Sequence, residues 1–164
     1  MNKNNFLVLR AGIHSTFQDF GFSNTQHLGI TTGGAVDQHL FMISNKILDN
    51  PLNTPVIEFS SQGPCLKLIK GITRVAVCGN VLFNIINSNK TYKGVPYKSY
   101  LLKKGDIIDI LSTIKSNYGY LAIEGGFNIT REFGSYSTLS IAKIGSNKGK
   151  IITNKQNIYF RKIL

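Results

Sequence analysis

The chain has 164 residues, of which 42% are hydrophobic and 16% charged, enough to enclose one core but too few for a series of ordinary domains. We therefore expect residues 1–164 to form a single domain. No apolar run approaches the roughly 18 residues that a membrane-spanning helix needs, and no secretory leader is evident, so we expect neither membrane spanning nor export.

The net charge of +11 raises the question of nucleic-acid binding. Fifteen of the 19 cationic residues are lysines scattered singly, and only four are arginines, the residue that direct base readout favours. This distribution argues against a nucleic-acid partner. The end of the chain differs, because six lysines and arginines follow Glu132 with no acidic residue among them. That end could meet an acidic partner or form a solvated basic face.

Short alternating or β-branched runs, each bounded by Gly, Pro, Asn or Asp, predict a mainly β domain. The first such run is Phe6–Ala11. Eight more follow from residue 56 onward: Val56–Phe59, Cys65–Ile69, Thr73–Cys78, Val81–Ile86, Ser99–Leu102, Ile107–Leu111, Tyr118–Ile123 and Asn157–Phe160.

One segment predicts a helix. Asp37 can cap its amino end, Asn50-Pro51 ends it, and apolar residues recur between them at helical spacing. Its outward face would carry Gln38, Asn45 and Asp49. Many short strands with a lone helix favour a barrel or closed sandwich over a βαβ array, because parallel crossovers would need several helices.

Two cysteines, Cys65 and Cys78, lie in apolar surroundings without a CxxC motif, which argues against a disulfide framework and a zinc site. We expect buried thiols on neighbouring strands and a reducing cytoplasm. The three histidines, His14, His27 and His39, lack metal-ligand spacing, so no metal site is expected.

Polar residues crowd the segment from His14 to Gly21, directly after the first strand. Loops on a rigid sheet can aim such groups into a site, with Thr16, Gln18 and Asp19 as the candidates. The alternative is a turn in which the side chains satisfy local backbone N–H groups.

A second polar segment, Thr31 to Asp37, precedes the helix. Gly33 and Gly34 would let backbone amides approach a ligand, and the helix amino terminus favours an anion. The alternative is that Asp37 fills this position as a structural cap, and neither a P-loop nor GxGxxG is present.

Carboxylates stand at two further strands. Glu124, followed by Gly125 and Gly126, could act as a general base or be an exposed charge at the end of a strand. Glu58 lies within an alternating strand, so it either points outward or is buried at a cost unless paired. Ser135 and Ser137 could donate hydrogen bonds to a substrate, but neither lies in a Gly-x-Ser-x-Gly elbow.

Taken in order, these segments resemble one known family: allophanate hydrolase subunit 2, the C subunit of bacterial 5-oxoprolinase and the antagonist of a sporulation-kinase inhibitor, which is similar to biotin-dependent carboxyltransferases. The resemblance spans about residues 10 to 150. Its pieces are Ser15–Gly21, Gly33–Asp37 leading to Asn45 and Asn50, Ile57-Glu58, Gly63-Pro64, Val77–Gly79, Gly105-Asp106, Tyr120–Gly126 and Gly134–Thr138.

The resemblance implies a cyclophilin-like β-barrel with one or two helices, corresponding to about the amino-terminal half of the longer family members. It also implies pairing with a subunit 1 homologue, and with a larger lactam-utilisation subunit in 5-oxoprolinase, which opens 5-oxoproline to glutamate using ATP. In urea carboxylase the similar region receives carboxybiotin. No cofactor is expected on this chain itself, and ATP is expected in the partner complex.

The chain departs from the family at two positions. Phe22 and Tyr136 stand where family members often carry arginine, and neither can replace a charged bidentate fork.

Two functions therefore compete. In the first, the chain is an enzyme subunit whose site, shared with the partner, handles a small amide. Asp19 and Glu124 would be its catalytic groups, and the substrate-binding groups would be Thr16, Gln18, Gly33, Gly34, Asp37, Gly125, Gly126, Ser135 and Ser137. In the second, the chain is a non-catalytic binding protein that sequesters a subunit 1-like kinase inhibitor, or a degenerate remnant.

Overall fold

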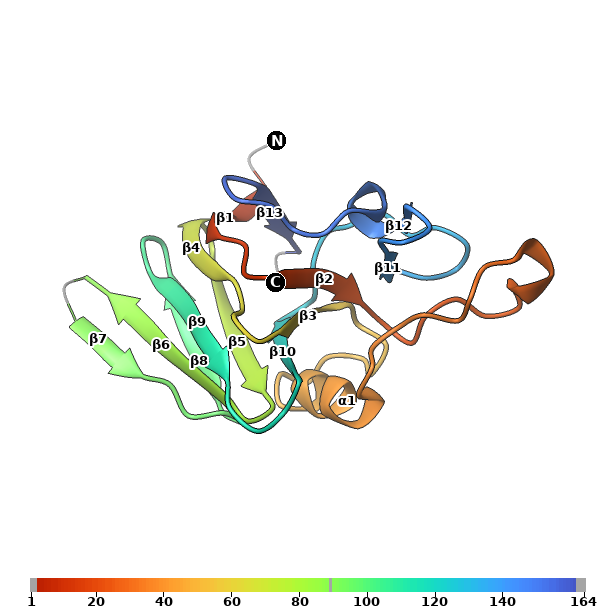
Figure 1. The fold of residues 1–164 in the computed structure, drawn as a ribbon. Coiled ribbons are helices and arrows are strands. Elements are labelled where there is room, and N and C mark those ends of the chain that lie inside the picture. The colour runs from red at the N-terminus through yellow and green to blue at the C-terminus, as the bar shows by residue number, and fades with distance from the viewer. Residues whose placement is uncertain (1–2, 89, 162–164) are drawn as a thin grey trace.

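The computed structural model describes residues 3–88 and 90–161, which form two β-sheets packed face to face and one α-helix (Figure 1). The six-stranded sheet has the order β13 (Asn157–Phe160), β1 (Asn4–Arg10), β4 (Cys65–Lys70), β9 (Ile107–Thr113), β6 (Val81–Asn87), β7 (Lys90–Lys93). The five-stranded sheet has the order β2 (His14–Gln18), β3 (Val56–Ser60), β10 (Tyr118–Ile123), β5 (Ile72–Cys78), β8 (Ser99–Lys103).

Every pairing in these sheets is antiparallel, and the first and last strands lie side by side, with Asn4 opposite Phe160. Within the described residues no ladder joins one sheet to the other, so the barrel is incompletely closed. A small ribbon of β11 (Thr138–Leu139) and β12 (Ile144–Gly145) stands apart, and short 3₁₀ turns occupy Gln26–Leu28 and Ser146–Gly149. The prediction of a mainly β, cyclophilin-like, barrel-like fold with one or two helices is confirmed: the described residues contain one α-helix, and the two sheets do not join into a closed barrel.

Alternation along the strands builds the core between the sheets. Phe6 and Val8 of β1 point inward, as do Ile57 and Phe59 of β3, and all are buried. Phe160 of the last strand packs on Phe6 with ring centroids 5.3 Å apart. The two ends of the chain therefore share one core.

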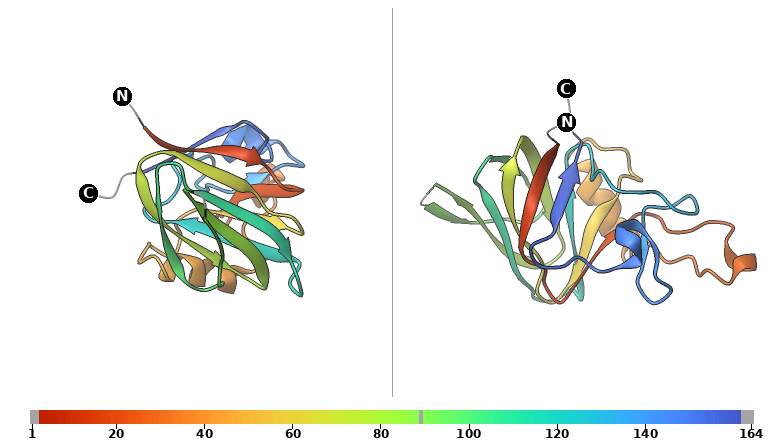
Figure 2. Two further views of the ribbon diagram at one scale, coloured as in Figure 1. Left: turned by 90° about the vertical axis from the view of Figure 1, so that its left-hand side faces the viewer. Right: turned by 90° about the horizontal axis from the view of Figure 1, so that it is seen from above.

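Helix α1 (Gln38–Lys46) covers the outer face of the five-stranded sheet over β10 and β5 (Figure 2). Phe41 is fully buried there, and burial of such a side chain contributes about 2 kcal/mol. Small residues of the sheet, Ala76 and Ala122, lie in the same cluster and leave space for the helix. The Asp37 side chain accepts a hydrogen bond from Leu40 N at 3.0 Å, so the predicted helix and its cap are confirmed.

The expectation that Asn45 faces outward is wrong. Asn45 is buried, and its side chain donates to the carbonyls of Thr54 (2.8 Å) and Leu52 (3.4 Å) while accepting from Asn50. The chain after the helix folds back under this residue, and its carbonyl groups need a donor. A polar residue on a helix is thus buried by the loop that follows it.

All nine predicted strands are present, each within two residues of its expected limits. Strands β2 and β7 and the short pair β11 and β12 were not predicted. Cys65 and Cys78 are buried and unpaired as expected, but they lie on β4 and β5, which belong to different sheets. Burial raises the pKa of the Cys65 thiol to about 11 and that of Cys78 to about 12.

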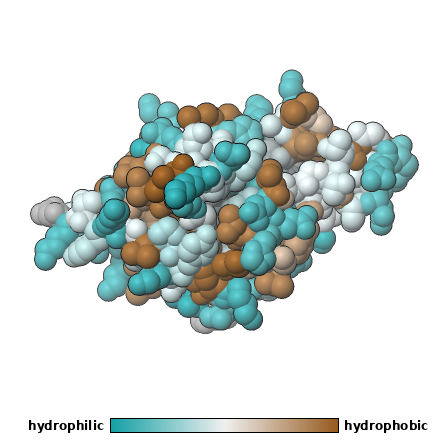
Figure 3. All heavy atoms as spheres, turned by 60° about the horizontal axis from the view of Figure 1, so that its bottom comes forward, coloured by the Kyte–Doolittle hydropathy of each residue, from teal (hydrophilic) through white to brown (hydrophobic). Residues whose placement is uncertain are grey.

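On the face seen in Figure 3, hydrophobic residues lie in several separate groups among hydrophilic ones. Scattered exposed apolar residues are normal for a folded protein. Of the helices in the described segments, none has the length and apolarity to cross a membrane.

Candidate functional site

Three segments far apart in the sequence meet at the carboxyl end of β2, and Asp19 joins them. Its Oδ1 accepts hydrogen bonds from Ser135 Oγ (2.5 Å), Ser137 Oγ (2.7 Å) and Gly21 N (2.8 Å). Its Oδ2 accepts from Tyr136 N (2.7 Å), and its own amide donates to Ser137 Oγ. We call Asp19, Ser135, Tyr136 and Ser137 the Asp19 cluster. It ties the segment after β2 to the segment before β11.

The third segment, before α1, runs back against the residues that follow β2. Ala35 N donates to Asp19 O (2.9 Å) and Phe22 N donates to Thr32 O (2.6 Å). Two glycines permit this approach: a Cβ on Gly34 would lie 2.7 Å from the Phe20 carbonyl carbon, and one on Gly21 would collide with Thr32 O. Both also have positive φ, which other residues adopt at a cost.

Thr16 and Gln18 lie under this junction. Both are buried, and Gln18 Nε2 donates to Thr16 Oγ1 (2.9 Å) and to Thr138 O (3.0 Å). Gln18 Oε1 is buried without a hydrogen-bond partner among the described residues. The pair extends the contact between β2 and the segment that carries Ser135 and Ser137.

Glu58 and Tyr120 hold the segment before α1 from below, and we call them the Glu58 clamp. Glu58 Oε2 accepts from Val36 N and from the Tyr120 hydroxyl, each at 2.8 Å, and that hydroxyl accepts from Asp37 N at 2.7 Å. Glu58 does point away from the barrel core, but the segment covers it, so only 5% of the residue is exposed. Outward direction and burial therefore coexist, because the Val36 amide and the Tyr120 hydroxyl supply the partners that a buried carboxylate needs.

Burial raises the pKa of Glu58 above its usual range, and the hydrogen bonds from Val36 and Tyr120 oppose the shift. His14 on β2 lowers this pKa and Asp37 raises it through their charges. Burial and the neighbouring carboxylate raise the pKa of the Tyr120 phenol.

The clamp occupies the amino terminus of α1. The helix amino terminus was expected to favour a ligand anion. Instead the Val36 and Asp37 amides bind Glu58 and Tyr120, while the Leu40 amide binds the Asp37 cap. Glu58 thus occupies the place that a ligand carboxylate would take. Gly33 and Gly34 shape the neighbouring segment, with Gly33 lying beside the Phe22 ring.

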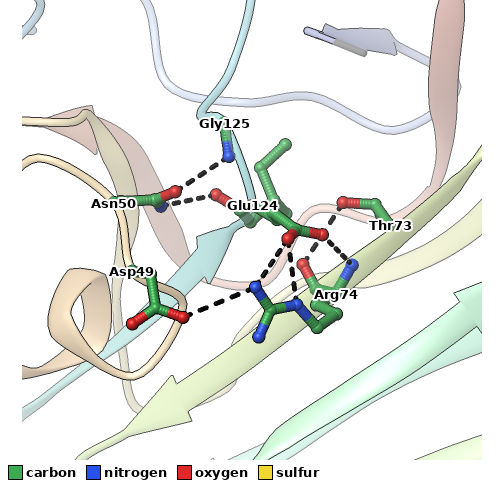
Figure 4. A network of polar contacts seen from close by, with 7 residues as sticks. Asp49, Asn50, Thr73, Arg74, Glu124 and Gly125 are labelled. Atoms are coloured by element: carbon green, nitrogen blue, oxygen red, sulfur yellow. Dashed lines mark hydrogen bonds and ion pairs between the residues drawn. The ribbon is translucent and has the colours of Figure 1, made fainter. Parts of the chain in front are cut away.

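The carboxylate of Glu124 lies in a different set of contacts (Figure 4). Arg74 Nε and Nη2 donate to Glu124 Oε1 at 3.0 and 2.6 Å, and Asp49 Oδ2 lies 3.6 Å from Arg74 Nη2. These bonds from Arg74 lower the pKa of Glu124. No recorded contact within the described ranges links this carboxylate to the Asp19 cluster.

The glycines after Glu124 are also held by structural contacts. Gly125 N donates to Asn50 Oδ1 at 2.8 Å, while Asn50 Nδ2 donates to Ile123 O (Figure 4). A Cβ on Gly126 would collide with the Thr54 side chain. Of the predicted site residues, the structure therefore brings together Thr16, Gln18, Asp19, Gly33, Gly34, Ser135 and Ser137, with Asp37 at the adjoining cap, and sets apart Glu124, Gly125 and Gly126.

A recess of about 330 Å³ opens beside the Asp19 cluster, where the segment between β2 and α1 projects from the body (Figure 1). This volume lies at the lower end for small-molecule pockets. Its walls combine aromatic, hydroxyl and amide groups with one cation: Asp19, Phe20, Gly21, Phe22, Ser23, Asn24, Gln26, Thr32, Asn53, Arg131 and Gly134. We call it the Arg131 recess.

Arg131 was not singled out from the sequence, and neither was Tyr120. Arg131 lies in an irregular segment without a motif, and only its position three residues before Gly134 hints that it reaches the same cluster. Tyr120 belongs to an apolar strand, so the sequence gives no sign that its hydroxyl has a partner. That partner is Glu58, which lies directly opposite it on the neighbouring strand. In the part of the chain that is described, no group of three or more His, Cys, Asp or Glu residues is placed to hold a metal ion.

Comparison with known proteins places the chain in a family. The family model described as carboxyltransferase domain, subdomain A and B, matches residues 28–163. Urea amidolyase of Saccharomyces cerevisiae is 26% identical over 142 residues, 86% of this chain and 8% of that protein. The C subunit of 5-oxoprolinase from Haemophilus influenzae is 27% identical over 145 residues, 88% of this chain and 46% of that protein.

Solved structures agree on the fold. The urea amidolyase of K. lactis superposes with a TM-score of 0.90 at 24% identity, over 99% of this chain and 10% of that one. The urea carboxylase of Kluyveromyces lactis gives the same score and identity over 14% of its chain. The chain spans less than half the length of the curated relatives cited here. With most of its length matched by the family model, the chain belongs to the family of carboxyltransferase domains, subdomain A and B.

Proposed function

We propose that the chain is a subunit of an ATP-dependent enzyme that acts on a small amide, of the 5-oxoprolinase type, with an allophanate hydrolase-like complex as the related possibility. The Arg131 recess and the loops around it form one wall of the substrate site. A subunit 1 homologue closes the site, and a larger lactam-utilisation subunit joins the complex. ATP is bound by these partners, since the sequence of this chain carries no nucleotide motif.

One observation carries the proposal: three segments on which the sequence resemblance rests, residues 15–21, 33–37 and 134–138, meet through the contacts of a single carboxylate residue, Asp19, beside an open recess. Loops at the end of a rigid sheet are where binding residues are commonly placed. The relatives named as C subunits of 5-oxoprolinase support the choice of a lactam over other amides.

Within this site Asp19 has a structural role in place of the catalytic role expected from the sequence. Four donors already engage the carboxylate, three of them at Oδ1 and one at Oδ2. Asp19 would therefore act by fixing the loops rather than by moving a proton. Glu58, with its raised pKa, is the carboxyl group better suited to proton transfer once a partner rearranges the segment above it.

The test is reconstitution. ATP-dependent opening of 5-oxoproline is measured with a subunit 1 homologue and a lactam-utilisation homologue, with and without this chain. Turnover is expected only with all parts present. Equal turnover on omission of the chain would reject the proposal.

The non-catalytic alternative has a specific observation in its favour, because both carboxylates predicted to be catalytic, Asp19 and Glu124, are engaged in structural bonds. On that alternative the chain binds a subunit 1-like protein without contributing chemistry. Glu58→Gln separates the two: it abolishes turnover in the reconstituted enzyme if Glu58 transfers a proton, and leaves partner binding intact in both cases.

A further inference from the structure

We propose that Arg131 binds the carboxylate of a small amide substrate in the Arg131 recess, with the amide of that substrate lying against Phe20. The inference rests on the proposed function and names the substrate class: a monoanion in which a carboxylate stands next to an amide or lactam. 5-Oxoproline and allophanate share this chemistry.

The guanidinium of Arg131 is fixed on one side and open on the other. Its Nε donates to Gly134 O at 2.8 Å, and its Cζ lies 5.8 Å from the centre of the Tyr136 ring. Across residues 3–88 and 90–161, no other hydrogen bond or ion pair of Arg131 is recorded. The terminal nitrogens, which can form a bidentate fork with a carboxylate, thus have no protein partners within those ranges.

Tyr136 and Phe22 explain why this arginine is placed as it is. These are the two positions where the sequence lacks an expected cation; Phe22 lines the recess and Tyr136 lies against Arg131. Tyr136 is itself anchored, because its amide donates to Asp19 Oδ2. The backbone of Tyr136 is thus held in place, its ring offers the guanidinium a cation–π contact, and the positive charge reaches the recess from residue 131.

The charges around the recess suit a single negative group. Arg131 and Asp19 are the only charged residues in its described lining. The Asp19 carboxylate is turned toward four donors, which disperse its charge. A dianion such as phosphate would require more cations than this lining supplies, whereas a monoanion is matched by one fork.

The remaining walls suit an amide. Asn24, Gln26 and Asn53 supply side-chain donors and acceptors, and Ser23 and Thr32 supply hydroxyls. Phe20 stands edge-on to Phe41, with ring centroids 5.1 Å apart, so its ring is held in place by the buried face of α1. An apolar wall with a few convergent polar groups is the usual construction of a small-molecule site.

The experiment is a titration of the isolated full chain with 5-oxoproline and with allophanate, followed by calorimetry and by the NMR shift of the Arg131 Nε–H signal. The recess is lined by residues of this chain, so binding is expected without partners. Arg131→Gln should weaken the affinity about tenfold or more, and Arg131→Lys should restore only part of it, because a lysine lacks the fork. Lys104→Gln removes the same charge from an exposed turn and should leave the affinity unchanged.

Three results would overturn the inference: no binding of either carboxylate at millimolar concentration, equal losses in Arg131→Gln and Lys104→Gln, or inorganic phosphate binding as tightly as 5-oxoproline. Thermal unfolding of each variant verifies that it is folded. The relative affinities for 5-oxoproline and allophanate distinguish the two substrates. If the isolated chain binds neither carboxylate but turnover of the reconstituted complex still depends on the chain, the inference about Arg131 is wrong and the proposed function stands.

Discussion

At the residue scale, Asp19 shows how one buried carboxylate can organise loops that the sequence leaves separate. Its donors are two hydroxyls and two backbone amides from both sides of the junction. Ser135 Oγ also accepts from Ser137 N, so the donors are themselves oriented. Hydrogen bonds to a charged group are worth more than neutral ones, and a network of them holds a geometry that single bonds would not.

Asp19→Asn should therefore lower the free energy of unfolding by about 2 kcal/mol. In the parent protein both carboxylate oxygens accept hydrogen bonds, whereas in the variant the side-chain NH₂ would replace one of them and face a donor. Urea denaturation followed by circular dichroism measures the change. Asp106→Asn is the matched control, since the Asp106 side chain accepts one hydrogen bond, from Lys103 N, in an exposed turn. A similar loss in both variants would contradict the role assigned to Asp19.

Glu58 makes the free energy of unfolding fall as the pH rises, whereas a carboxylate in an ion pair makes it rise. Its pKa is raised in the folded protein from the usual 4.5, so the folded state binds a proton more tightly than the unfolded one. The stabilisation is complete below pH 4.5 and is lost as the pH rises through the folded pKa. Glu58→Gln should thus gain stability relative to the parent across that interval.

The measurement is the free energy of unfolding of Glu58→Gln minus that of the parent, between about pH 4 and pH 8. Subtraction removes the other carboxylates, which titrate equally in both proteins. Tyr120→Phe, which removes the hydroxyl that joins Glu58 to Asp37, serves as a second probe of the same clamp. A pH-independent difference for Glu58→Gln would show that Glu58 has no raised pKa.

What the sequence could reveal at this scale was proximity rather than role. The order of polar segments predicted that residues 16–19 and 135–137 share a place, and they do. It could not predict that four neighbouring groups donate to the Asp19 carboxylate, because two of them are backbone amides whose direction is set by the fold. Arg131 was missed for a similar reason. Its contacts are with the Gly134 carbonyl and the Tyr136 ring, and no sequence motif links an arginine to either of them.

At the element scale, strands β2 and β7 escaped prediction from the sequence for different reasons. Strand β2 has the composition of a polar turn, since it carries His14, Thr16 and Gln18; Thr16 and Gln18 are nevertheless buried, because later segments cover them. Tertiary contacts thus override a polar composition. Strand β7, with the sequence Lys-Thr-Tyr-Lys, is an exposed edge strand paired only to β6 among the described strands, so its composition carries no core signal.

The contact between Arg74 and Glu124 joins β5 to the end of β10, and Asp49 adds the turn that follows α1 (Figure 4). The bonds from Arg74 lower the pKa of Glu124, so this stabilisation is present above pH 4.5 and is lost as the pH falls through the folded pKa. Glu124→Gln should cost about 1 kcal/mol at pH 7, a modest value because both side chains are partly exposed, and the cost should shrink in acid.

Chemical denaturation at about pH 7 and about pH 3 measures that difference. Asp49→Asn is the control: the Asp49 side chain is 82% exposed and its carboxylate is 3.6 Å from Arg74, so its loss should cost under about 0.5 kcal/mol. If Glu124→Gln leaves stability unchanged at neutral pH but abolishes turnover in the reconstituted enzyme, Glu124 has the catalytic part first expected of it.

At the scale of the whole molecule, the site depends on how the chain ends meet. The core cluster runs from Phe6 to Phe160, and Ile152 near the carboxyl end donates its amide to Ser15 O on β2, at the base of the site. Phe127 forms a bridge to Phe160 and packs edge-on against Phe17 of β2, with ring centroids 5.2 Å apart. The strand that carries Thr16 and Gln18 is thus supported by residues from the last third of the chain.

This arrangement predicts that residues 1–164 unfold as one unit. Phe160→Ala should remove about 3 kcal/mol of stability, because a buried ring at the junction of both ends is lost. Tyr159→Ala, on the exposed face of the same strand, should cost far less. In urea, tyrosine fluorescence and far-ultraviolet circular dichroism should shift together to lower midpoints in Phe160→Ala, since the first and last strands share one core. Separate transitions for the two signals would mean that the site-bearing sheet folds independently of the terminal strands, and the single-domain prediction would then be wrong.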